Sequence, residues 1–300
     1  MRLSIFGSSQ IINHHINAAI KNSFKIHSIC TSNKNSSNVK NLAKKYKIKN
    51  VYYNWKKFLK DCSQNNASVL IAGRIIDNEK ILMSCLNLNL IVIIEKPVFT
   101  DPKKFNKFLK FKKNIFVGYN RIFYKNIQKV QEILDTDNLL NVSIKCPEIN
   151  RKNISINTCH VISIIYYIFN KIYLIKKIKK KDSIFCIFIT KKKIPIFINI
   201  NFNSPDNFSI EFILKKKRLK IKPLENLKIY NKLIKKKYKN TNIYVPNLSE
   251  TIDEYAGSNF KPGFENQYKN FKKFIQNKKC NHLNIQHAKE IIEICQVIEK

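Results

Sequence analysis

Hydrophobic and polar residues follow two different patterns along this chain, and the change falls near residue 138. In residues 1–137, short apolar runs typical of buried strands alternate with segments whose apolar residues recur at helical spacing. The expected strands are residues 3–7, 25–30, 51–53, 69–73, 90–94 and 115–119. The expected helices are residues 11–20, 37–46, 55–62, 78–86, 102–111 and 125–134. This alternation predicts an α/β domain built on a parallel, doubly wound sheet.

Residues 138–300 contain strands with little helix between them, which predicts an α+β domain with an open, mostly antiparallel sheet. The expected strands are residues 142–146, 173–178, 184–190, 194–202, 208–214 and 219–221, and the expected helices are 158–169, 264–276 and 285–298. Residues 240–261 are expected to form a loop. Lysine triplets at 179–181, 191–193, 215–217 and 235–237 are interpreted as hairpin ends and solvated edges. Two domains, 1–137 and 138–300, are therefore predicted.

The composition is that of a folded protein with an ordinary core. Of 300 residues, 44% are hydrophobic and 25% charged, which excludes collagen-like, rod-like and disordered classes. The apolar runs are shorter than a membrane span, and the first residues lack the pattern of a signal peptide, so a cytoplasmic protein is expected. The eight cysteines are irregularly spaced, which favours free thiols in a reducing compartment and no metal site.

The formal net charge of +36 raises the question of a polyanionic partner. Only five of the 56 basic residues are arginine, although arginine is the residue that makes bidentate phosphate contacts. Lysine, asparagine and isoleucine are abundant, while glycine and proline number five and eight, a bias typical of an AT-rich genome. We therefore interpret the lysines as a solvated coat and expect no specific nucleic-acid partner. A polyanion-binding basic protein remains one alternative.

The residues that carry candidate chemistry follow the expected strands of the first domain, where ligands of doubly wound sheets bind. Gly7 ends the first strand and leads into a helix, an arrangement that can cradle a diphosphate on backbone N–H groups. The candidate contacts are Gly7, Ser8, Ser9, Gln10 and Ile11. Ser9 and Ile12 stand where the dinucleotide fingerprint has its second and third glycines, so this motif alone is weak.

Polar residues also follow the later strands. After the second strand, Ser32, Asn33 and Lys34 stand where an acidic residue usually holds the adenosine ribose. A serine with a nearby lysine can instead accept a 2′-phosphate, which slightly favours NADP, and a plain polar loop is the alternative interpretation. Lys96, in the tripeptide Glu95-Lys96-Pro97, follows the buried fifth strand. A pair of polar residues, Asn120 and Arg121, follows the sixth strand, and His160 lies on the apolar helix that opens the second domain.

The order of these pieces resembles the glucose–fructose oxidoreductase / inositol dehydrogenase (Gfo/Idh/MocA) family. The resemblance rests on the Gly7 turn, Glu95-Lys96-Pro97, the Asn120-Arg121 strand end and His160, and it covers nearly the whole chain. It implies a Rossmann domain that binds NAD or NADP and a second domain whose open sheet pairs subunits into a homo-oligomer, a dimer or tetramer. The segments 223–225 and 261–267 resemble members found with bacterial surface-polysaccharide genes.

The same resemblance implies roles for individual residues. Lys96 and His160 are the expected catalytic pair, with His160 as acid or base at the reacting hydroxyl of a sugar or nucleotide-sugar. The expected substrate contacts are Lys96, Asn120, Arg121, Asn157 and His160. The expected cofactor contacts are those of the Gly7 turn and the Ser32 loop, together with Gly73, Arg74 and Glu95.

This chain departs from the family pattern near its catalytic residues. The acidic residue usually found four positions before the histidine is Ile156, and the aspartate often found three positions after it is Ser163. A base without a carboxylate partner is less well oriented and less basic. A catalytically degenerate member that binds a dinucleotide or sugar without turnover therefore remains a second alternative.

Overall fold

The computed structural model describes residues 1–256 and 261–300. The chain folds into two compact units, Met1–Phe123 with Gly263–Glu293, and Tyr124–Pro262 with Ile294–Lys300. This division differs from the expected boundary after residue 137, because helix α5 (Lys125–Leu134) packs within the second unit. There, Asn126 donates its side-chain amide to the Leu224 carbonyl at 2.9 Å and its backbone N–H to Glu254 at 2.6 Å.

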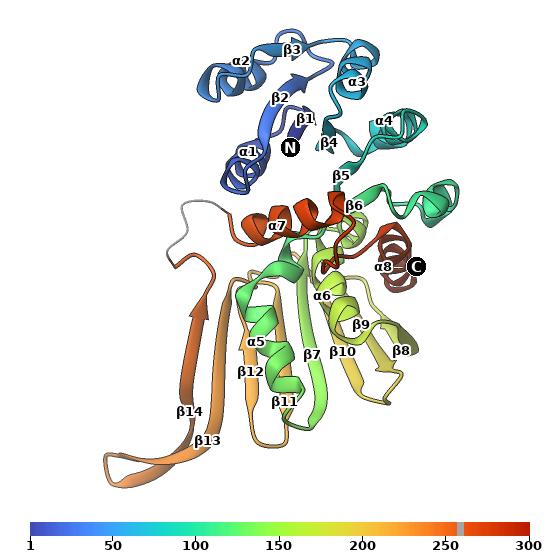
Figure 1. The fold of residues 1–300 in the computed structure, drawn as a ribbon. Helices are drawn as coiled ribbons and strands as arrows, with labels where there is room; N and C mark the ends of the chain where they lie inside the picture. Colours follow the sequence, from blue (N-terminus) through green and yellow to red (C-terminus); the bar gives the residue numbers. More distant parts are fainter. Residues whose placement is uncertain (257–260) are drawn as a thin grey trace. The chain divides into compact units, whose positions relative to one another are not determined.

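The first unit is built on a parallel sheet with the strand order β3-β2-β1-β4-β5-β6 among the described residues (Figure 1). Its strands are β1 (Arg2–Phe6), β2 (Lys25–Cys30), β3 (Asn50–Tyr52), β4 (Ser68–Ile71), β5 (Val92–Glu95) and β6 (Ile115–Gly118). Strands β4 and β6 are buried along their whole length, as strands covered on both faces must be. The predicted doubly wound α/β fold is confirmed.

The helices of the first unit begin largely where the sequence predicts. They are α1 (Ile12–Lys21), α2 (Ser37–Lys45), α3 (Trp55–Gln64), α4 (Ile75–Asn87) and α7 (Phe264–Ile275). Ser36 and Asn54 cap α2 and α3 by accepting backbone N–H groups of the first turn. Residues 102–111 form a 3₁₀ helix, η1 (Pro102–Phe111), rather than the expected α-helix, and a second one, η2 (Asn120–Phe123), follows β6. Helix α7 packs against α1 and β6 (Figure 1).

The second unit contains the predicted open sheet, with the order β14-β13-β12-β11-β7-β10-β9-β8 in the part of the chain that is described. Its strands are β7 (Leu139–Glu148), β8 (Ile172–Lys179), β9 (Ser183–Thr190), β10 (Pro195–Phe202), β11 (Ser209–Leu214), β12 (Arg218–Ile221), β13 (Asn226–Tyr238) and β14 (Thr241–Asp253). Neighbouring strands are antiparallel except β7 and β10, which are parallel. Helices α5 and α6 (Cys159–Phe169) lie on one face of this sheet (Figure 1), and helix α8 (Ile285–Glu299) closes the chain.

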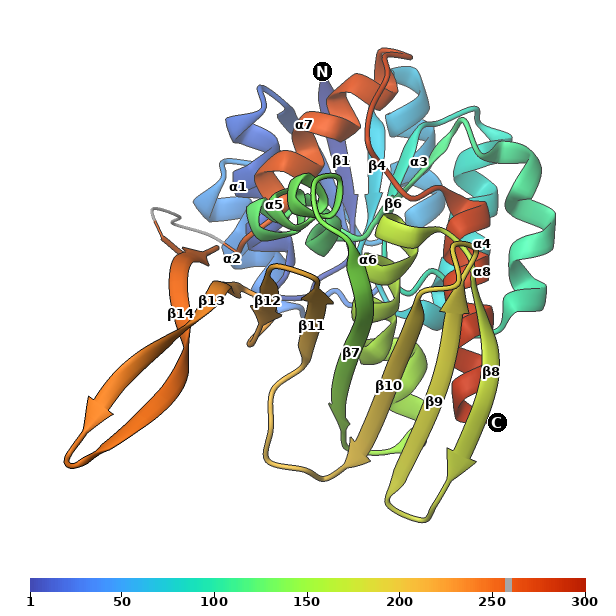
Figure 2. The same cartoon turned by 90° about the horizontal axis from the view of Figure 1, so that it is seen from below.

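The prediction of a loop at residues 240–261 is wrong over most of that range. Strands β13 and β14 form a long hairpin there that extends away from the rest of the second sheet (Figure 2), and residues 257–260 lie outside the described part. Its outer half is exposed on both faces, so the apolar alternation that reveals half-buried strands is absent. The lysine triplet 235–237 lies within β13, whereas the other three triplets lie at hairpin turns as predicted.

All eight cysteines are free thiols, and all but Cys280 are buried.

Within residues 1–256 and 261–300, none of the helices has both the length and the hydropathy needed to cross a membrane.

Candidate functional site

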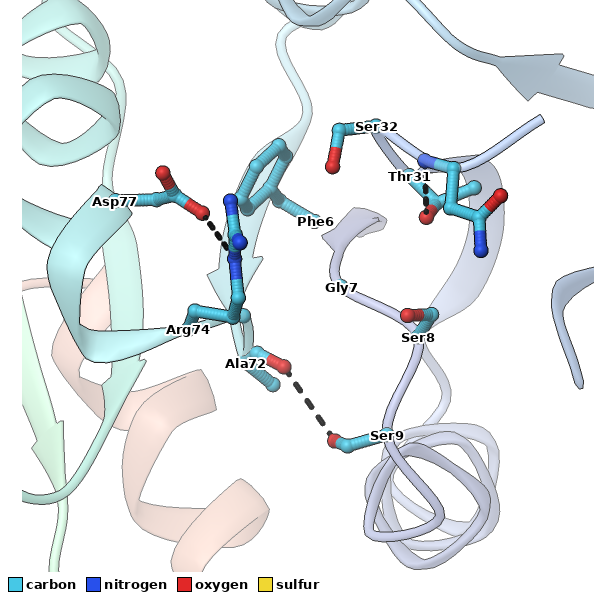
Figure 3. Close-up of a pocket in the computed structure, with 11 residues that line it drawn as sticks. Phe6, Gly7, Ser8, Ser9, Thr31, Ser32, Ala72, Arg74 and Asp77 are labelled. Carbon is cyan, nitrogen blue, oxygen red and sulfur yellow. Dashed lines mark hydrogen bonds and ion pairs between the residues drawn. The ribbon is translucent and has the colours of Figure 1, made fainter. Parts of the chain in front are cut away.

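A hollow of about 340 Å³ opens at the carboxyl ends of β1, β2 and β4 (Figure 3). Because β2 and β4 flank β1, the strand order reverses here, which is where doubly wound sheets bind their ligands. The lining residues are Phe6, Gly7, Ser8, Ser9, Thr31, Ser32, Asn33, Ala72, Gly73, Arg74 and Asp77. Seven predicted cofactor contacts are among them, whereas the other four are not among the described residues that line this hollow: Gln10, Ile11, Lys34 and Glu95.

Gly7 is required by the geometry of the turn. Its φ of +140° is strained for any other residue, and a Cβ atom there would lie 2.3 Å from the Ala72 carbonyl oxygen. The Gly7 N–H donates to the Cys30 carbonyl at 2.9 Å, so the turn is fixed against both neighbouring strands. The chain consequently leaves β1 close to the sheet and enters α1 facing the hollow.

The N-terminus of α1 has the properties of an anion site. No side chain caps its first turn, and no acidic residue lies in that turn. The N–H groups of residues 12–14 donate to the carbonyls of the preceding turn, so it is the positive end of the helix dipole that favours a bound phosphate, and the small Ser8 and Ser9 leave space for it. Ser9 Oγ lies 3.4 Å from the Ala72 carbonyl oxygen, on the wall of the hollow (Figure 3). Ile12, at the third fingerprint position, is fully buried in the core. These features fit the diphosphate of a dinucleotide.

The loop after β2 forms the opposite wall. Thr31 is buried and accepts the Asn33 N–H at 3.2 Å, which directs Ser32 and Asn33 along the hollow. Asn38 of α2 donates to the Ser8 carbonyl and ties this loop to the Gly7 turn. The acidic residue of this hollow comes from elsewhere: Asp77, in the first turn of α4, pairs with Arg74 at 3.0 Å (Figure 3).

The ends of β5 and β6 bring a second set of predicted residues to the same edge of the sheet. Glu95 pairs with Gly118 in the strand register, so Lys96 and the Asn120-Arg121 dipeptide follow neighbouring strand ends. Asn78 of α4 is buried and donates its side-chain amide to the Val98 carbonyl at 2.9 Å. The turn that follows Lys96 is thus fixed from α4, the helix that precedes β5 in the chain.

The second unit carries His160 as the second residue of α6, directly after a π-helical turn (Ile154–Thr158). Ile156, at the missing acid position, is 37% exposed. A different carboxylate holds this turn: Glu148, buried at the end of β7, accepts the Asn157 amide at 3.1 Å and the Thr158 hydroxyl at 2.5 Å. Lys96 and His160 belong to different units, and their pairing stays a prediction.

Sequence reasoning missed Glu148, although a signal was present. Inward-facing residues of β7 alternate as Val142, Ile144, Cys146 and Glu148, so the same period that marks the core also places this carboxylate inside. Burying a carboxylate costs free energy unless its oxygens are bonded. A carboxylate buried at a strand end is therefore a candidate for a functional residue. Among the described residues, no cluster of three or more His, Cys, Asp or Glu side chains is arranged to hold a metal ion.

Comparison with solved structures shows the same two-unit fold in dehydrogenases. The chain is similar to a dehydrogenase (MviM) from Clostridium difficile, with 15% identity, a TM-score of 0.77, and coverage of 99% of this chain and 98% of that one. An oxidoreductase from Agrobacterium radiobacter, solved in complex with NAD+, L-tartaric acid and magnesium, has 10% identity, a TM-score of 0.74, and coverage of 99% and 94%.

A third similar structure is the UDP-N-acetylglucosamine 3-dehydrogenase GnnA from Acidithiobacillus ferrooxidans, with 8% identity, a TM-score of 0.73, and coverage of 100% and 96%. At these identities the likeness establishes the fold alone. No curated protein sequence matches the chain.

The family assignment comes from the sequence of the first unit. Residues 1–114 match the family model described as the oxidoreductase family with an NAD-binding Rossmann fold, GFO_IDH_MocA. This match spans the Gly7 turn, the hollow and Lys96. The predicted resemblance and the predicted NAD(P) cofactor are thereby confirmed: residues 1–114 match the NAD-binding Rossmann domain of the Gfo/Idh/MocA oxidoreductases.

Proposed function

We propose that this protein is an NAD(P)-dependent oxidoreductase that transfers hydride between a carbon of a sugar or nucleotide-sugar and the nicotinamide. The observation that carries the proposal is the Gly7 turn, which directs the N-terminus of α1, with no acidic residue in its first turn, toward a hollow at the strand-order reversal. The bound cofactor supplies a hydride acceptor or donor. Everything else in the reaction must come from side chains of this protein.

The adenosine and diphosphate end is assigned to the hollow, with Ser32 and Asn33 beside the ribose and Ser8 and Ser9 beside the phosphates. The nicotinamide end is assigned to the carboxyl end of β5, where Lys96 follows Glu95. This division follows from the sheet order, since β5 lies one strand beyond β4.

His160 is assigned the proton transfer at the substrate hydroxyl. On oxidation, the hydroxyl proton passes to the imidazole as the carbon loses hydride, leaving a carbonyl; on reduction, both return. Lys96 donates a hydrogen bond to the reacting oxygen, and Asn120 and Arg121 orient the sugar. Glu148 acts indirectly, because its hydrogen bonds with Asn157 and Thr158 fix the turn that leads into the helix carrying the histidine.

A second hollow favours a nucleotide-sugar over an uncharged sugar. It measures about 600 Å³ and lies beside the ends of β7 and β10. Arg151 is held there by a 3.0 Å bond to the Lys180 carbonyl and lies over the Phe202 ring, at 5.7 Å from its centroid. Lys152 and Lys181 also line it. These three cations, one of them a fixed guanidinium, outnumber the single carboxylate of Asp182 in the lining and suit the phosphates of a sugar nucleotide. A place in polysaccharide synthesis is compatible with such a substrate.

The direct test is titration of the purified protein with NADH and NADPH, followed by turnover assays on sugars and nucleotide-sugars. We expect micromolar to millimolar binding of at least one cofactor, and turnover that falls about 100-fold or more in Lys96→Ala. Failure of both cofactors to bind at millimolar concentration would refute the proposal. Cofactor binding without turnover on any substrate would move the assignment to the degenerate alternative. A homo-oligomer formed through the second sheet and a cytoplasmic location also stay predictions.

A further inference from the structure

A buried chain of three side chains joins the C-terminal segment to the end of β5. His15 of α1 is fully buried, and its Nδ1 lies 3.0 Å from the hydroxyl of Tyr268 in α7. Its other ring nitrogen, Nε2, lies 2.9 Å from Oε1 of Glu95. The three residues come from three elements of the first unit, and none of them has a role in the hydride transfer described above.

The two polar contacts of His15 lie on opposite edges of its ring. Burial raises the pKa of the Tyr268 phenol well above its usual value, so the hydroxyl keeps its proton and can donate to Nδ1. On the other edge, Nε2 and Glu95 Oε1 are in close polar contact at 2.9 Å, without the alignment of a hydrogen bond. Aromatic packing fixes the ring plane, since the Phe264 ring lies edge-on to His15 at 4.8 Å.

The carboxylate end of the chain lies against β6. A Cβ atom at position 118 would lie 3.1 Å from Glu95 Oε1 and 3.2 Å from the Ile94 carbonyl, so Gly118 leaves the space that the carboxylate occupies. The Glu95 side chain is still 21% exposed, and Lys96 follows it directly in the chain. Glu95 is therefore held from inside the protein while part of it faces solvent.

We propose that Tyr268 and His15 are positioning residues that hold Glu95, and with it the strand end that carries Lys96, in the geometry that receives the nicotinamide half of the cofactor. This inference rests on the proposed function, which assigns that half to β5. A strand end fixed before binding loses less conformational freedom when the ligand arrives, so affinity rises. It also explains why α7, from the far end of the sequence, packs in the first unit.

The test compares NADH with ADP-ribose, which lacks the nicotinamide ring, by calorimetric titration of the full chain. His15→Leu removes both the hydrogen bond with Tyr268 and the polar contact with Glu95, and Tyr268→Phe removes only the hydroxyl. We expect each to weaken NADH binding about tenfold and to leave ADP-ribose binding unchanged. His15→Gln should restore much of the NADH affinity, because its amide can donate to Glu95 from nearly the position of Nε2.

A matched control is available in the same unit. His27 also pairs with a carboxylate, at 2.9 Å from Asp61, but on β2 and away from β5. His27→Leu should leave the binding of both ligands unchanged.

Three results would overturn the inference. Unchanged NADH affinity in both His15→Leu and Tyr268→Phe would show that the chain of side chains does not serve the cofactor, while the proposed function would stand. Equal losses of NADH and ADP-ribose affinity would show a general structural role instead. If the unaltered protein bound neither ligand, the proposed function would fail first and this inference with it.

Discussion

Replacing Ser9 with aspartate separates cofactor binding from folding, because the affinity for NADH should fall while the midpoint of thermal unfolding should rise. Ser9 is exposed just before α1, whose first turn has no acidic residue and no side-chain cap. A carboxylate there interacts favourably with the helix dipole, by roughly 0.5 kcal/mol. In a chain of this size the midpoint of thermal unfolding should therefore rise by about 1 °C.

The same carboxylate opposes the cofactor diphosphate. For two phosphate charges at about 5 Å and an effective dielectric of about 60 at this exposed position, Coulomb repulsion is roughly 2 kcal/mol. That value corresponds to about a 30-fold increase in the dissociation constant of NADH. Added salt should reduce the loss, since the charges are solvent-accessible.

Fluorescence titration of NADH and thermal unfolding of the same samples measure both effects. Asn54→Asp serves as the control, because it places a carboxylate at the N-cap of α3, which does not border the hollow. Unchanged NADH affinity in Ser9→Asp, with the expected rise in the unfolding midpoint, would show that the diphosphate does not lie at the N-terminus of α1.

Five further substitutions have expected outcomes. Lys34→Glu should lower the affinity for NADPH more than the affinity for NADH. If the protein binds both cofactors equally well with and without the substitution, this loop does not discriminate between them. His160→Ala should cost about 100-fold or more in kcat with cofactor affinity kept, and Ile156→Asp should raise kcat if the lost acid limits turnover. Glu148→Gln should lower kcat with little change in the KM of the cofactor, whereas a parallel loss of both would indicate a purely structural role. Burial lowers the pKa of His282 from its usual 6.5, so stability should be complete above about pH 6.5 and fall as pH falls below it, and His282→Phe should flatten that fall in a series of unfolding midpoints between pH 7.5 and 5.

Much of the first unit could be predicted because its signals are local. Buried parallel strands appear as short apolar runs, and their polar ends mark the ligand edge without knowledge of long-range contacts. Gly7, Ser32 and Arg74 were found in this way, and they line one hollow. Lys34, four positions beyond β2, was expected beside them but is not among the described residues that line the hollow.

The contacts that sequence analysis missed are all long-range. Nothing local to His15 indicates that its ring lies between Glu95 and Tyr268, since one partner comes from β5 and the other from a helix near the C-terminus. The β13–β14 hairpin was missed for a different reason. Its outer half has no buried face, so the residue pattern carries no strand period to detect.

Loss of the acid at Ile156 first suggested a degenerate protein, but the structure supplies a physical reason to expect retained chemistry. A carboxylate buried at a strand end is costly unless its oxygens are bonded, and both oxygens of Glu148 accept from the turn before His160. That turn is π-helical, a geometry that recurs at functional sites. We therefore propose that Glu148, on β7, does for His160 what an acidic residue at position 156 would do, because it orients the turn that leads into the helix carrying the histidine.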